Sequence, residues 1–271
     1  MSPVAILYGA VVGLSLGLTG GGGAIFAVPL LVYGLGIDPR EAVGASLVTV
    51  GATALVGFLQ RWHLGFVELR TGLLFAVAGM VTAPLGAWLA MQVSEALLLV
   101  LFALLMLVVA VRMWRKADVP AERNVVLTPA DEFGPVCRRD LRGELHWNSR
   151  CALLLAAAGL GTGLLTGLFG VGGGFIIVPA LVLLSGMGMQ RAVGTSLLVI
   201  ALVSASGTTS LIAAGRGIPW SVVGWFAAGS LVGLGVGSRL ASLIGGPKLQ
   251  RIFAVAILFV AVFVFTRNLA F

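Results

Sequence analysis

The sequence has very little charge. Only 10% of its 271 residues are Asp, Glu, Lys or Arg, whereas 59% are hydrophobic. Soluble domains carry about 25% charged residues, so this composition excludes an ordinary soluble domain. Apolar runs of about 17 to 25 residues recur along the chain, the length a helix needs to cross roughly 30 Å of hydrocarbon. Short alternating segments typical of an outer-membrane barrel are missing, so we predict an all-α, polytopic helical membrane protein.

Carboxylate, histidine and activated nucleophilic side chains are scarce within the apolar segments. The carboxylates outside the central hydrophilic stretch and its flanks all fall at predicted helix ends; they are Asp38, Glu41, Glu68 and Glu95. His63 lies in a short charged loop, where we expect it to be solvated. Because no paired carboxylate, histidine cluster or activated nucleophile is predicted at membrane depth, we expect neither an enzyme nor a bound metal or cofactor.

Basic residues outnumber acidic ones by 17 to 10. They lie between apolar segments, so we interpret them as topological signals rather than as a nucleic-acid surface. No Lys or Arg precedes Arg40, so the basic start of a cleavable signal peptide is missing, and the first apolar segment is expected to remain in the mature protein. The two cysteines, Cys137 and Cys151, are expected to be free thiols on the cytoplasmic side, and with His146 they match no standard metal spacing.

Glycine, by contrast, is abundant and gathers in two related segments. Residues 17–29 read GLTGGGGAIFAVP, and residues 167–179 read GLFGVGGGFIIVP. A shift of 150 residues aligns them without a gap, with 17 identities in the 38 positions from 13 to 50. We therefore predict a tandem duplication, in which two membrane repeats flank a hydrophilic cytoplasmic linker; the boundaries are 1–116, 117–149 and 150–271.

Each repeat is predicted to contain a glycine-broken helix pair, discontinuous or re-entrant, followed by three transmembrane helices. A hairpin at the break makes the number of crossings odd and the repeats inverted, whereas a single crossing makes them parallel. With the linker inside, inversion leaves three of the 17 basic residues outside and the parallel arrangement leaves five, which favours inversion. The predicted segments are 4–37, 42–59, 69–90 and 96–114, then 151–187, 192–213, 220–243 and 249–265.

The glycine clusters predict a binding site. Each glycine costs a helix about 1 kcal/mol relative to alanine, so a run of them breaks it. A dinucleotide-binding loop would need a preceding strand, and a P-loop would need a GK pair, neither of which is present. Close helix packing is the common use of glycine in membranes, yet it does not account for a consecutive run. A helix that restarts after a break points its free amides and positive dipole end at the break, which suits an anion.

Each glycine segment ends at a proline, Pro29 or Pro179, and is followed by AVG-x-S at 42–46 and 192–196. This pattern resembles the TauE/SafE family of membrane transporters, which includes sulfite exporters and organosulfonate permeases. The resemblance covers both halves and implies transport of a small sulfur oxyanion or sulfonate across the cell (inner) membrane. The predicted substrate-binding residues are Thr19, Gly20, Gly22, Gly23, Ser46, Gly170, Gly172, Gly173, Gly174, Thr195 and Ser196.

The two halves are not predicted to contribute equally, because the first has Thr19 and Gly21 where the second has Phe169 and Val171. Arg40 and Arg191 are interpreted as interface anchors rather than ligands. An anion channel, or a family member that carries an unrelated small metabolite, stays open as an alternative. The expected partners are a small anion and membrane lipid without nucleic acid, and a homo-oligomer is compatible with the sequence.

Overall fold

The computed structural model describes residues 2–21, 23–117, 149–170, 172–215 and 217–243, and all regular structure in these ranges is helical. The all-helical class is therefore confirmed. Five helices are long and apolar enough to cross a membrane, namely α3, α4, α6, α8 and α9. The elements are α1 (Ser2–Thr19), α2 (Ala24–Pro29), the π-helix η1 (Leu30–Gly34), α3 (Pro39–His63), α4 (Leu69–Gln92), α5 (Glu95–Ala117), α6 (Ser149–Phe169), α7 (Gly174–Ser185), α8 (Met189–Ala213) and α9 (Trp220–Leu243).

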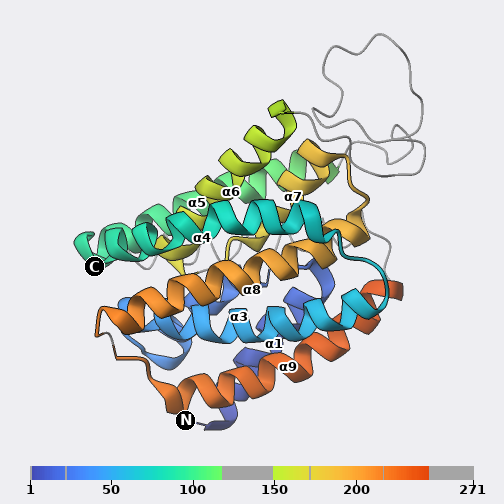
Figure 1. Cartoon of the computed structure of the whole chain (residues 1–271). Coiled ribbons are helices and arrows are strands. Elements are labelled where there is room, and N and C mark those ends of the chain that lie inside the picture. The colour runs from blue at the N-terminus through green and yellow to red at the C-terminus, as the bar shows by residue number, and fades with distance from the viewer. Residues whose placement is uncertain (1, 22, 118–148, 171, 216, 244–271) are drawn as a thin grey trace.

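The centre of the fold is the pair α3 and α8, which lie side by side (Figure 1). They are antiparallel, because Gly44 near the start of α3 lies against Leu211 near the end of α8, and Gly57 lies against Leu197. On one side α3 packs on α9, which carries α1, and on the other α8 packs on α4, which carries α6. The 150-residue shift matches α3 with α8, so their opposite directions are those an inverted repeat requires. The duplication itself remains a sequence inference.

The chain folds back on itself between α1 and α3. Gly23, at the start of α2, lies against Leu16 in the last turns of α1, and Gly34, at the end of η1, lies against Tyr8. The run from α2 through η1 is therefore antiparallel to α1, and both ends of this hairpin lie at the same end of the bundle. In the other half, Gly173 at the start of α7 lies against Thr166 of α6.

Glycines spaced four residues apart set the closest helix contacts. A Cβ added at any of them would overlap the backbone of the facing helix, so only glycine permits this separation. Small residues drive such contacts in lipid, where hydrocarbon is as apolar as a leucine side chain and close backbone approach adds dispersion energy. The glycines are Gly9, Gly13, Gly17, Gly229, Gly233 and Gly237 between α1 and α9, and Gly159, Gly163 and Gly167 of α6, which face α4.

Helix α3 starts at Pro39, whereas the sequence predicted a start at residue 42. Asp38 is the N-cap, where its side chain accepts a hydrogen bond from the backbone N–H of Arg40 at 2.9 Å. Pro39 occupies the first helical position, and Glu41 places negative charge in the first turn. The residues interpreted as the end of the first segment are thus a helix-start signal, since a capping Asp, an N1 proline and an early acidic residue each favour an N-terminus.

One other prediction is wrong, and several fall on residues that the structure does not describe. The expectation of free thiols is wrong for Cys151, which is disulfide-bonded, while Cys137 lies outside the described residues. That expectation rested on the assumed cytoplasmic side, where thiols are kept reduced. Gly22, the predicted helix 249–265 and most of the linker 117–149 also lie outside the described residues.

The close packing of α1 on α9 predicts opposite effects for two neighbouring glycines of α9. Gly233→Ala would place a methyl group on the carbonyl oxygen of Ala10, so we expect a loss of about 1 to 3 kcal/mol in stability, as for other overpacked contacts. At Gly235 a Cβ meets nothing within 4 Å, so Gly235→Ala should be neutral or slightly stabilising. Thermal unfolding of the purified variants in detergent measures both; equal melting temperatures would contradict the packing account.

Candidate functional site

The two glycine segments meet between the central helices. A Cβ on Gly21 would overlap the backbone of Gly174, and a Cβ on Gly174 would overlap that of Gly21, so no side chain separates the two segments. Both glycines are buried. Gly172 lies between Val50 of α3 and Ile200 of α8. The structure therefore brings glycines of both predicted segments to one buried point beside the α3–α8 pair.

The backbone at this point adopts conformations that favour glycine. φ is positive at Gly20 (74°), Gly170 (68°), Gly172 (67°) and Gly173 (62°), in the left-handed region that side-chain-bearing residues rarely enter. Gly20 and Gly170 directly follow the last residues of α1 and α6, where a left-handed glycine commonly ends a helix.

A serine from the opposite half holds the carbonyl at each helix end. Ser46 Oγ donates to the carbonyl oxygen of Gly170 at 2.6 Å, and Ser196 Oγ donates to that of Gly20, also at 2.6 Å. Both serines are fully buried. Their hydroxyl protons are thus directed at backbone carbonyls, and their contact with a substrate stays a prediction.

The two threonines that were predicted to bind substrate make different contacts. Thr19 Oγ1 donates to the carbonyl oxygen of Ser15 at 2.7 Å, one turn back in its own helix. Thr195 Oγ1 accepts from the backbone N–H of Glu68 at 3.0 Å, and the Thr195 methyl group lies against Gly72 of α4. Thr195 therefore faces α4 rather than the glycine segments, and the structure does not bring it to their meeting point.

The remaining donors at the site are backbone amides at two helix starts. Gly173 is the N-cap of α7, and Gly23 is the N-cap of α2, whose run continues through η1. The first amides of a helix have no intrahelical acceptor and lie at the positive end of its dipole. No Lys or Arg occurs in residues 1–39 or 151–190, so these segments carry no basic side chain of their own beside the backbone amides.

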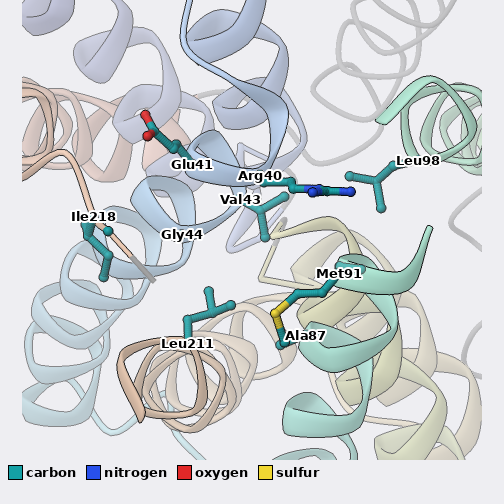
Figure 2. Close-up of a pocket in the computed structure, with 11 residues that line it drawn as sticks. Arg40, Glu41, Val43, Gly44, Ala87, Met91, Leu98, Leu211 and Ile218 are labelled. Carbon is teal, nitrogen blue, oxygen red and sulfur yellow. The ribbon is translucent and has the colours of Figure 1, made fainter. Parts of the chain in front are cut away.

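A cavity of about 110 Å³ lies between the start of α3 and the end of α8 (Figure 2). Val43 lines it and also lies against Gly170, so the cavity and the second glycine segment both contact Val43. Arg40, predicted to be an interface anchor, lines this cavity, and its Nη2 donates to the carbonyl oxygen of Val93 at 3.4 Å. In Figure 2 Arg40 extends toward Leu98, and Glu41 points away from it.

Arg61 is a residue that the sequence analysis missed. It was placed in a charged loop, but α3 continues to His63, and Arg61 Nη2 donates to the carbonyl oxygen of Gly17 at 3.2 Å. A cation is favourable near a helix C-terminus, here that of α1. The 150-residue shift matches Arg61 with Leu211, which lines the cavity at the other end of α3.

The apolar helices long enough to span a bilayer define a multi-pass helical membrane protein. The family described as Sulfite exporter TauE/SafE matches residues 5–264, and the chain therefore belongs to that family. It is a membrane transporter of this family.

Relatives agree with this assignment. A probable membrane transporter protein of Xylella fastidiosa (strain 9a5c) is 35% identical, with 98% of this chain and 96% of the relative covered. The probable membrane transporter protein YunE of Bacillus subtilis (strain 168) is 28% identical, with 89% of this chain and 87% of the relative covered. These names indicate a transporter rather than an enzyme. No solved structure matches the chain.

The hydrogen bonds of Ser46 and Ser196 predict a loss of stability on truncation. Ser46→Ala or Ser196→Ala leaves a buried glycine carbonyl without its donor, which costs about 1 to 3 kcal/mol. We expect lower melting temperatures for both variants, measured in detergent. Thr49→Ala is the matched control, because Thr49 Oγ1 donates only to Ala45 within its own helix. If the two serine variants melted like the wild type and only lost substrate affinity, the serines would be ligands and not supports.

Proposed function

We propose that this transporter carries a small sulfur oxyanion or organosulfonate, with sulfite as the simplest candidate, through the point where the glycine segments meet. The observation that supports it most is the direct contact of Gly21 with Gly174, which places two helix starts at one buried point. The description of the family names sulfite export, whereas the names of the relatives specify no substrate.

Backbone amides suit a transported anion for an energetic reason. A hydrogen bond to a charged group contributes about 1.5 to 3 kcal/mol, so a few amides offset much of the cost of removing the anion from water. A buried Lys or Arg would instead leave an unpaired charge whenever the site was empty. Net binding that only partly exceeds this cost suits a carrier, which must release its cargo.

The burial of the glycines supports a carrier over a channel. Gly172 and Gly174 are buried, and both lie against Ile200 of α8. The segment is thus closed between the described helices, and passage of an anion requires the packing around it to change. Flux should therefore saturate with substrate and show counterflow, which a fixed open pore does not.

Substitution at Gly172 tests the amide site. Gly172→Val forces a left-handed backbone to carry a branched side chain between Val50 and Ile200, so we expect counterflow of labelled sulfite in proteoliposomes to be lost. Gly36→Ala is the matched control, because Gly36 has a similar φ of 69° but open space around it. Its transport should persist. Normal counterflow by a folded Gly172→Val protein, with loss in Arg191→Gln, would replace the amide site by a side-chain countercharge.

We also propose that the protein lies in the cell (inner) membrane and that residues 117–149 face the cytoplasm. The support is the distribution of basic residues, because Lys and Arg orient membrane proteins during insertion and the inverted arrangement leaves only Arg40, Arg216 and Arg267 outside. The disulfide at Cys151 favours the opposite side, since such bonds persist mainly in oxidising compartments. The distribution of basic residues and the disulfide therefore predict opposite outcomes for one labelling experiment.

That experiment places single cysteines in a background with Cys137→Ser and Cys151→Ser. An impermeant maleimide added to intact cells should label Ser2→Cys and leave Ala130→Cys unlabelled until the cells are opened. Labelling of Ala130→Cys in intact cells would refute the cytoplasmic assignment, and protection of both positions would favour parallel repeats.

A further inference from the structure

Three fully buried hydroxyls have no hydrogen-bond partner among the residues that the structure describes: Thr71, Ser204 and Ser230. A hydroxyl that is buried without a partner has lost its hydrogen bonds to water and gained nothing in return, so each such group calls for an explanation. Ser204 differs from the other two because of where it lies.

Ser204 lies in α8 one helical turn from the meeting point of the glycine segments. Its Cβ lies beside Gly51 of α3, at the crossing of the two central helices. Ile200 is four residues earlier, on the same face of α8, and lies against both Gly172 and Gly174. Ser204 is therefore one helical turn, a rise of about 5.4 Å, from the residue of α8 that packs on the glycines.

The neighbouring hydroxyls of α3 cannot serve in the same way. Thr49 Oγ1 donates to the carbonyl oxygen of Ala45 at 2.8 Å, and Thr53 Oγ1 donates to that of Thr49 at 2.7 Å. Such bonds to the carbonyl one turn back satisfy a mid-helix hydroxyl without any ligand. The 150-residue shift matches Ser204 with Ala54, so this hydroxyl belongs to the second half only.

We propose that Ser204 Oγ is a further ligand of the transported anion and selects polyatomic oxyanions over halides. This inference rests on the amide site proposed above. An oxyanion has several acceptor oxygens, so one can accept from the amides of the glycine segments while another accepts from Ser204. Chloride offers only one acceptor atom, on which both donors would have to converge, whereas an oxyanion offers a separate oxygen to each donor. The hydroxyl completes a site for an extended anion.

The test compares Ser204→Ala with Ser230→Ala. Ser230 is equally buried and unpartnered, but it lies in α9 against Gly13 of α1, away from the glycine segments. Calorimetry with sulfite on purified protein in nanodiscs should show affinity about tenfold weaker or worse for Ser204→Ala and unchanged for Ser230→Ala. Competition by chloride should be the same in all three proteins.

Stability separates a ligand from a structural role. Ser204→Ala removes an unpaired buried hydroxyl, so its melting temperature without ligand should equal or exceed that of the wild type. A lower melting temperature with a parallel loss of affinity would make Ser204 structural and overturn the inference. Wild-type sulfite affinity in Ser204→Ala, with loss in Gly172→Val, would also overturn it and leave the amide site standing. Unchanged affinity in both variants would refute the amide site as well.

Discussion

Every peptide group at membrane depth needs a partner within the protein, because the hydrocarbon offers no water. The helix ends at Thr19 and Phe169 expose carbonyls that α1 and α6 cannot satisfy alone. Ser196 donates to the carbonyl of Gly20, and Ser46 donates to that of Gly170, so each half satisfies the helix end of the other. Neither break is complete without the opposite half. The site exists only where the two halves are packed together.

Glycine has two separate functions in this fold. In α1 the helical Gly13 lets the backbone of α9 approach, and its importance lies in the space that a Cβ would occupy. At Gly172 the importance lies in the backbone itself, which takes a φ of 67°. The two functions are joined along the chain, because α1 is held to α9 by its glycines and ends at the break. A displacement of α1 and α9 against α3 and α8 would therefore move the first glycine segment.

The sequence predicts the parts of this structure that depend on local composition. Apolar length placed α4 and α9 within two residues at each end, and the cost of glycine in a helix placed the ends of α1 and α6. Contacts between distant residues were not predictable. Ser46 and Gly170 are 124 residues apart, so the sequence marked both as site residues without indicating that one would bond the other. Ser204 has no glycine run or motif around it, and only its unpartnered burial identifies it.

The two ends of α3 differ, and this difference bears on how an anion would pass. Near the start of α3, Leu211 lines a cavity together with Val43, which also lies against Gly170. Near its other end, the matched position is Arg61, which reaches the carbonyl of Gly17. An anion that entered through the cavity and left beside α1 would pass the end that Arg61 occupies. Opening that end would require the hydrogen bond from Arg61 to Gly17 to break, and the positive charge released there would attract the departing anion. The two ends of α3 thus differ at this matched position, with Leu211 beside the cavity at one end and the cationic Arg61 beside the end of α1 at the other.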